Sequence, residues 1–273
     1  MPVDPWSIPT LASAAYENRE EIQKTWAKVT RILLGKKSQL AITGMPGVGK
    51  SVLVDHFTGK AYARGYNPPA HRSIDLERTK IKGSSARMIL SVIPGQESPE
   101  RHESLDAVFE SKRRVDGIIH VVCNGYTTLR DPAARSFLIK QGINVEKFRQ
   151  QQLADEIKDF TTTADSIRRS FRRNKSRPWL IVAVDKFDLF ANDDDRTLAY
   201  ARYAAPGGEF YEQVDSLRSQ VGTDNLISEV APVSAWLEDF VWGDESTPST
   251  LTVSQRDALI GGLLKMIEDR CER

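Results

Sequence analysis

The sequence is poor in cysteine, with Cys123 and Cys271 as the two thiols in 273 residues. Two thiols are too few for a disulfide framework, and they fit a reducing compartment. A surplus of charge is missing too, because 38 Lys and Arg residues face 37 Asp and Glu residues. The chain as a whole therefore has no net electrostatic attraction to nucleic acid or to acidic membranes, and nucleic acid is not indicated as a partner.

Long apolar runs are also missing. No stretch approaches the roughly 18 apolar residues that cross a bilayer, so we expect no membrane span. The opening segment, MPVDPWSIPT, has neither the basic nor the apolar region of a secretory signal. Together with the cysteine count, these absences predict a cytoplasmic protein.

Short apolar runs are present, and helical patterns separate them. Residues 39–43, 115–122 and 179–184 are mostly apolar and too short for a typical helix. Such runs indicate buried strands of a mostly parallel sheet with helices on both faces, which is an α/β fold. We further predict strands at about 73–81, 86–93 and 228–233, and helices at about 14–34, 51–64 and 255–270.

The segment from Gly44 to Ser51 reads GMPGVGKS and matches G-x-x-x-x-G-K-[ST] between a predicted strand and a predicted helix. Glycines let such a loop curl so that its N–H groups surround a phosphate at the helix N-terminus. Lys50 would reach the β- and γ-phosphates and assist catalysis, and Ser51 would ligate Mg²⁺. The pattern predicts a P-loop NTPase fold with phosphate contacts from Gly44, Pro46, Gly47, Val48, Gly49, Lys50, Ser51 and Val52.

A second motif follows the strand predicted at 179–184. Asp185-Lys186-Phe187-Asp188 reads D-K-x-D, and here the chain resembles the Ras-like, translation-factor-related GTPases, whose base-recognition motif is N-K-x-D. The resemblance implies that Asp188 accepts hydrogen bonds from guanine N1–H and the 2-amino group, which adenine cannot offer. It also implies that Lys186 packs over the base. Asp185 stands where the family usually has Asn.

A third motif follows the last predicted strand. Ser234-Ala235-Trp236 resembles the family's short S-A-x segment, which implies that the backbone N–H of Ala235 meets guanine O6. With Asp185, Lys186 and Asp188, these three residues form the predicted base site.

The segment between the first two motifs resembles the family's D-x-x-G-Q sequence. The resemblance implies that the Gly95 N–H contacts the γ-phosphate and that Gln96 orients the attacking water. Val92 occupies the position of the Asp that supports Mg²⁺ in the family. The family's metal-sensing Thr is also missing, so Ser73 is the nearest candidate for a second metal ligand, and Arg72 beside it is a candidate arginine finger.

The resemblance covers residues 38–273, so we expect one P-loop GTPase-like domain after a lead-in and helix at 1–37. Two long intervals, about 127–177 and 189–226, are expected to be helical insertions, since structureless loops of that length are uncommon. The implied ligands are GTP or GDP and Mg²⁺, and the implied function is a slow GTPase switch with a protein effector or regulator of unknown identity. Two alternatives stay open: a degenerate nucleotide-binding scaffold without turnover, and a P-loop ATPase or kinase.

Overall fold

The computed structural model describes residues 6, 20–28, 39–69, 75–82, 87–96, 98–111, 114–174 and 177–272. Part of the helix expected at 14–34 is present, because residues 20–28 are helical. Ser73 and Arg72 lie outside the described residues, as does the connection between the strands predicted at 73–81 and 86–93.

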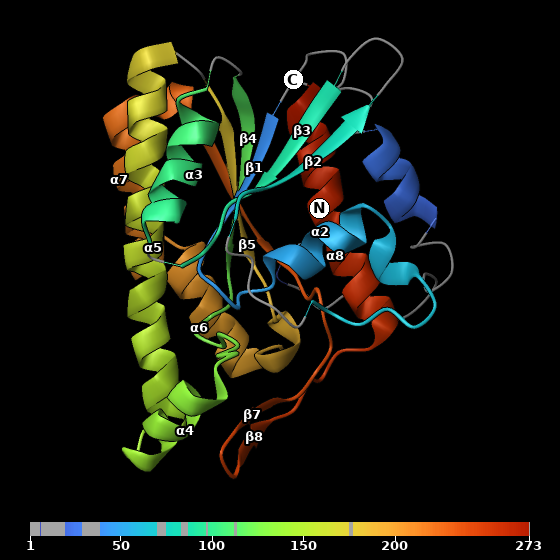
Figure 1. Cartoon of the computed structure of the whole chain (residues 1–273), viewed down its shortest axis with the longest axis vertical. Helices are drawn as coiled ribbons and strands as arrows, with labels where there is room; N and C mark the ends of the chain where they lie inside the picture. The colour runs from blue at the N-terminus through green and yellow to red at the C-terminus, as the bar shows by residue number, and fades with distance from the viewer. Residues whose placement is uncertain are drawn as a thin grey trace.

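A six-stranded sheet forms the centre of the molecule in the order β2-β3-β1-β4-β5-β6 (Figure 1). Every neighbouring pair is parallel except β2 and β3, which are antiparallel. The mostly parallel α/β sheet predicted from the sequence is confirmed. The strands are β1 (Gln39–Thr43), β2 (Glu77–Lys82), β3 (Arg87–Val92), β4 (Val115–Val122), β5 (Trp179–Val184) and β6 (Ile227–Pro232).

Helices cover both faces of this sheet, as predicted, and Figure 1 shows α3, α5 and α7 on one face with α2 and α8 on the other. The helices are α2 (Lys50–Phe57), α3 (Pro99–Phe109), α4 (Pro132–Lys140), α5 (Val145–Asn174), α6 (Asp193–Tyr203), α7 (Glu209–Val221) and α8 (Val253–Glu272). Single 3-10 turns lie at Lys60–Tyr62, Phe187–Leu189 and Thr223–Asn225.

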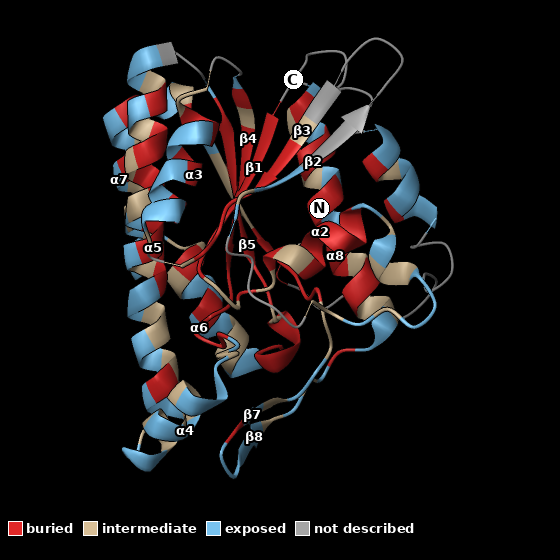
Figure 2. Cartoon of the chain, in the orientation of Figure 1, coloured by how far each residue is buried: buried red, intermediate tan, exposed pale blue. Residues whose placement is uncertain are grey.

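The central strands are largely buried (Figure 2), and their successive side chains enter two different cores. Leu180 and Val182 of β5 pack with the α3, α5 and α7 side, whereas Ile181 and Ala183 pack with the α2 and α8 side. This alternation follows from the two-residue period of a strand. A strand covered on both faces needs apolar residues at every position, which explains the continuous run from which β5 was predicted.

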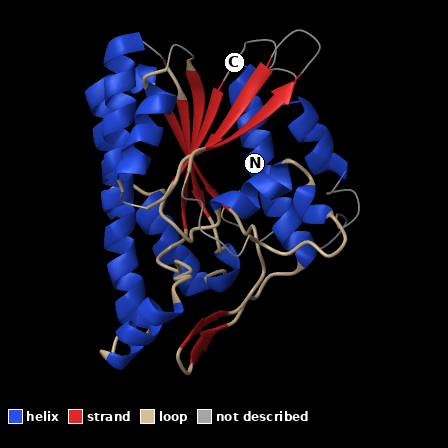
Figure 3. Ribbon diagram, viewed as in Figure 1, coloured by secondary structure: helices blue, strands red, loops and turns tan. Residues whose placement is uncertain are grey.

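The helix after the phosphate loop is shorter than expected. We predicted it to about residue 64, but α2 ends at Phe57 and a 3-10 turn follows. Gly59 has a φ of 77°, in the left-handed region that ends helices. The two long intervals hold helices, as Figure 3 shows: α4 and α5 in the first, α6 and α7 in the second.

A hairpin that we did not predict lies beside the α4 end of α5. It consists of β7 (Phe240–Trp242) and β8 (Glu245–Thr247), joined through Gly243 at a φ of 59°. Trp242 stacks on Phe148 of α5 at 4.0 Å between ring centroids, and its indole N–H donates to the carbonyl of Ile143. Within the described part of the chain, none of the helices has the length and apolar character needed to cross a membrane.

Candidate functional site

The loop between β1 and α2 can be built only with glycine at its turning points. Gly44, Gly47 and Gly49 have φ values of 128°, 76° and 106°. A Cβ on Gly44 would lie 2.1 Å from the carbonyl oxygen of Val121, and one on Gly47 would lie 2.3 Å from that of Thr128. The loop therefore packs directly against the end of β4 and the segment after it, with no room for a side chain.

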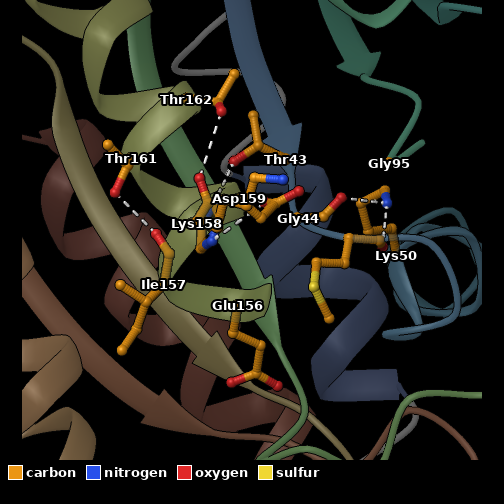
Figure 4. Close-up of polar contacts among 12 residues, drawn as sticks. Thr43, Gly44, Lys50, Gly95, Glu156, Ile157, Lys158, Asp159, Thr161 and Thr162 are labelled. Carbon is orange, nitrogen blue, oxygen red and sulfur yellow. Dashed lines mark hydrogen bonds and ion pairs between the residues drawn. The ribbon is translucent and has the colours of Figure 1, made fainter. Parts of the chain in front are cut away.

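Lys50, the first residue of α2, folds back over this loop. Its ammonium group donates to the carbonyl oxygens of Gly44 at 2.6 Å and Met45 at 2.7 Å (Figure 4). Burial lowers the pKa of Lys50 to about 7; nearby Asp159 opposes this shift, whereas Arg101 adds to it. Phosphate oxygens would favour the charged form of this lysine.

A cavity of about 310 Å³ lies in front of the loop. Most residues predicted for the phosphate site line it, including the predicted hydrolytic residue. They are Pro46, Gly47, Gly49, Lys50, Ser51, Val52, Gly95 and Gln96. Gly44 and Val48 belong to the same loop, but the cavity lining does not include them.

The opposite wall of the cavity comes from residues that the sequence did not reveal. Arg101 of α3 and Arg130 of the segment after β4 lie there with Gln152, Asp155, Lys158, Asp159 and Thr162 of α5. The spacing of Asp155, Asp159 and Thr162 places them on one face of the helix. That polar helix face was the feature of the sequence from which this wall could have been predicted. Sequence reasoning missed it because the interval contains no known motif.

A buried carboxylate on α5 holds the segment that leads into this wall. Glu156 Oε1 accepts hydrogen bonds from the backbone N–H groups of Cys123 and Gly125, each at 3.0 Å. Tyr203 Oη donates to the other oxygen. Burial raises the pKa of Glu156. The segment after β4 therefore starts from a fixed point on α5.

Gly95, the predicted γ-phosphate sensor, packs on the phosphate loop. A Cβ at Gly95 would lie 2.2 Å from Pro46 N and 2.3 Å from Met45 C. Only a glycine allows this approach, which keeps the segment of Gly95 and Gln96 within the cavity wall.

The end of β3 is apolar where the family resemblance calls for an acid. Val92 is 2% exposed and belongs to the core on the α2 and α8 side. Ser91 points the other way, and its hydroxyl accepts a 3.1 Å hydrogen bond from Gln39 Nε2. Neither side chain can replace a carboxylate beside a metal ion.

The donor set can still hold Mg²⁺ together with a nucleotide. Among the described residues, no group of three or more His, Cys, Asp or Glu could form a metal site by itself. Mg²⁺ in phosphate-transfer sites, however, takes most of its ligands from phosphate and water. Ser51, at the N-terminal end of α2, lines the cavity and fits the single hydroxyl ligand that such a site needs.

The residues predicted to recognise the base lie near this cavity without lining it, and Asp185 contacts several of them. Its Oδ1 accepts hydrogen bonds from the backbone N–H groups of Lys186 at 2.8 Å and Ala235 at 2.7 Å. A Cβ on Gly49 would lie 1.9 Å from Asp185 Oδ2, so this carboxylate also contacts the phosphate loop. Burial raises the pKa of Asp185 to about 7. The Ala235 N–H expected to meet guanine O6 donates to Asp185 in this structure.

Asp188 is fully buried, and only one of its two carboxylate oxygens accepts a hydrogen bond of ordinary geometry. Ser234 Oγ donates to its Oδ1, and Thr250 donates to its backbone carbonyl through N–H at 3.0 Å and Oγ1 at 2.7 Å. The hydroxyl of Ser249 lies close to this carboxyl group, but the second carboxylate oxygen, Oδ2, is buried and accepts no hydrogen bond of ordinary geometry from the described residues. Burial raises the pKa of Asp188. A buried acceptor of this kind is costly unless a ligand supplies the donor.

Lys186 connects the base motif to the phosphate loop. Its ammonium group donates to the carbonyl of Tyr126 and, at 2.7 Å, to Thr128 Oγ1. The N–H of Thr128 donates in turn to the carbonyl of Gly47 at 3.2 Å. The third motif is anchored as well, since the His56 ring of α2 is 2.7 Å from the carbonyl of Ala235 and Trp236 packs edge-on against Tyr66.

Comparison with known families agrees with this arrangement. The sequence model described as 50S ribosome-binding GTPase matches residues 39–183, which is more than half of the chain. The chain belongs to this GTPase family. The matched segment contains the phosphate loop, Gly95 and Gln96, and it ends two residues before Asp185. Membership of a GTPase family supports guanine-nucleotide binding.

Solved structures that match this chain share little sequence with it. The signal recognition particle receptor SRb-GTP/SRX complex from Chaetomium thermophilum is 12% identical, with a TM-score of 0.45 and coverage of 82% of this chain and 97% of that chain. A dimerization-deficient mutant of Toc33 from Arabidopsis thaliana is 12% identical, with a TM-score of 0.45 and coverage of 94% and 92%. A structure of the chloroplast translocon components atToc33 and psToc159 is 14% identical, with a TM-score of 0.49 and coverage of 96% of each chain. No curated protein matches this chain.

Proposed function

We propose that this protein binds GTP and GDP, hydrolyses GTP slowly with Mg²⁺, and acts as a nucleotide-controlled switch toward a protein effector or regulator. The observation that carries the proposal is the buried carboxylate of Asp188, whose Oδ2 accepts no hydrogen bond of ordinary geometry, in a motif that Lys186 and Thr128 link to the phosphate loop. Guanine offers two adjacent donors to such a carboxylate, whereas adenine presents an acceptor at N1.

The phosphate end of the proposed site is built from the cavity residues. Lys50 would give up its hydrogen bonds to Gly44 and Met45 and donate to the β- and γ-phosphates. Ser51 would ligate Mg²⁺, with Ser73 as a further candidate from outside the described residues. Mg²⁺ would neutralise phosphate charge during transfer.

Hydrolysis would depend on Gln96, which lines the cavity beside Gly95. Its side-chain amide can both accept from and donate to a water, so it can orient the attack on the γ-phosphate. Val92 provides no carboxylate for the metal shell, and slow turnover follows from that loss. Release of the γ-phosphate would free the Gly95 segment and change the surface presented to a partner.

The second candidate is a degenerate scaffold that binds nucleotide without turnover, and Val92 is the observation that favours it. A P-loop ATPase or kinase is disfavoured by the position and burial of Asp188. The cytoplasmic location expected from the sequence stays a prediction.

Phosphate release under single-turnover conditions separates these candidates. Gln96→Leu should slow release from GTP by about 100-fold and change GTP affinity by less than about threefold. Gln152→Leu is the matched control, because Gln152 lines the opposite wall of the same cavity, and it should retain turnover. Tight GTP binding with no phosphate release from the unaltered protein would contradict the switch and leave the scaffold.

A further inference from the structure

A buried arginine links the predicted hydrolytic segment to α5. Arg101 lies in the first turn of α3 and is 2% exposed. Its Nη1 donates to the backbone carbonyl of Gly95 at 2.7 Å and also to Asp159 Oδ1. A single guanidinium nitrogen therefore holds both the peptide after Gly95 and a carboxylate of another helix.

This pair is not needed to hold α3 against α5. Phe109 and Phe160 lie in the apolar core between these elements. At the surface, Arg169 of α5 also pairs with Asp106 of α3 at 2.9 Å. Because desolvation offsets most of the attraction within a buried ion pair, apolar residues of similar volume would hold two helices equally well. The contact with Gly95 is what the buried pair adds.

Asp159 lies beside the sheet. Its Oδ2 lies 3.7 Å from His120 Nε2 on β4, and His120 Nδ1 is 2.8 Å from Thr43 Oγ1, the last residue of β1. Burial lowers the pKa of His120 well below its usual range, so the ring is neutral. The Asp159 carboxylate thus lies between Arg101 and His120, and it makes no hydrogen bond to the neutral ring.

The carbonyl of Gly95 shares its peptide plane with the N–H of Gln96. A hydrogen bond that fixes this carbonyl therefore fixes the backbone from which the Gln96 side chain starts. Turnover depends steeply on placement, since small displacements of a water-orienting group cost a large part of the rate.

We propose that Arg101, held by Asp159, is a positioning residue that orients Gln96 toward the γ-phosphate and transmits the state of that site to α5. The inference rests on the proposed GTPase function. Arg101 acts through Gln96 and has no chemical role of its own.

The test replaces both Arg101 and Asp159 with apolar residues. Removing one partner alone would leave a buried charge without its counter-ion and could unfold the protein. Arg101→Met with Asp159→Leu should keep the fold and, at saturating GTP, reduce single-turnover hydrolysis by about tenfold or more. Arg169→Met with Asp106→Leu removes the exposed pair between the same two helices. That control should keep turnover within about twofold of the unaltered protein.

A double-mutant cycle distinguishes positioning from general structure. In the Gln96→Leu background, replacing the buried pair should cause no further loss of turnover, because the group it orients is already gone. An equal, additive loss in both backgrounds would overturn the inference. Unchanged turnover after replacement of the pair in the Gln96 protein would also overturn it.

If the unaltered protein does not hydrolyse GTP, the hydrolytic part of the proposed function is refuted. A second measurement then tests the role of Arg101 separately. Hydrogen exchange is measured at peptides covering Gly95 and Gln96 in two states of the protein, one with a non-hydrolysable GTP analogue bound and one with GDP bound, and the two states are compared. The analogue should protect these amides in the unaltered protein and in the Arg169–Asp106 control, and not after replacement of the buried pair. Equal protection in all three proteins, or none in the unaltered protein, would overturn the inference.

Discussion

The ammonium group of Lys50 lies 2.6 Å from the carbonyl oxygen of Gly44, the first residue of the loop that this lysine serves. The lysine is 7% exposed, and burial lowers its pKa to about 7. The loop carbonyls thus accept from the ammonium group that is proposed to bind phosphate oxygens. Binding must exchange these partners and restore the full positive charge of the lysine.

Nucleotide binding should therefore take up a proton at alkaline pH. Above about pH 7 the nucleotide-free lysine loses its proton, whereas phosphate holds it protonated, so affinity should fall as pH rises from about 7 to 9. Calorimetry of GDP binding at pH 8, in two buffers of different ionisation enthalpy, measures the uptake. Close to one proton is expected.

Lys60→Met is the control for this measurement, because Lys60 pairs with Asp55 at the exposed surface, and it should leave the uptake unchanged. Zero uptake at pH 8 by the unaltered protein would show that Lys50 is already fully protonated without nucleotide.

Asp185→Asn should stabilise the protein more at pH 8 than at pH 5. The folded-state pKa of Asp185 is raised from 3.8 to about 7, so the folded state binds the extra proton and this residue's contribution to stability falls as pH rises from about 4 to 7. Asparagine keeps the oxygen that accepts from Lys186 and Ala235 and carries no charge. Thermal unfolding should show a gain of about 5 °C at pH 8. Asp244→Asn, in an exposed turn, is the control, and a gain of equal size at both pH values would refute the assignment.

Asp188→Asn should reverse the base preference. An asparagine amide cannot accept from both guanine donors, but its NH₂ can donate to the 2-oxo group of xanthine. GDP affinity should fall by about 100-fold or more, and xanthosine diphosphate should bind better than GDP. Competition against a fluorescent nucleotide measures both constants. Unchanged GDP affinity would mean that Asp188 does not contact the base.

Gly47→Ala should abolish nucleotide binding, whereas Gly142→Ala should not. Both glycines have similar φ values, 76° and 73°, so the backbone strain is matched. A Cβ at Gly142 meets nothing within 4 Å, but one at Gly47 would lie 2.3 Å from the Thr128 carbonyl oxygen. Urea unfolding should show a loss of about 1 kcal/mol for Gly142→Ala and more for Gly47→Ala. Equal losses with GDP binding retained in both would contradict the proposed packing of the loop.

Much of the fold could be predicted because its signals are local. The strands of a parallel sheet that is covered on both faces must be apolar throughout, and for this reason the apolar runs at 179–184 and 115–122 could be predicted to be strands. The phosphate loop has a fixed spacing between its first glycine and Lys50. The shortened α2 was misjudged because the effect of Gly59 depends on its left-handed conformation, which composition alone does not reveal.

The opposite wall of the cavity could not be predicted because it depends on distant pairing. Arg101 and Asp159 are 58 positions apart, and each is an ordinary charged residue on an amphipathic helix until the sheet brings the helices together. The burial of Asp185 has the same origin, since its partner Ala235 lies 50 positions further along the chain. Such residues acquire their roles from tertiary contacts, and a local pattern such as a polar helix face does not show which site it faces.

The most direct test of guanine recognition is a titration of the unaltered protein with GDP, GTP and ATP in the presence of Mg²⁺. The buried Asp188 carboxylate predicts that GDP and GTP bind at least about 100-fold more tightly than ATP, since the adenine edge offers it no matching pair of donors. ATP binding as tight as GTP binding would contradict the assignment of the base site and with it the proposed function.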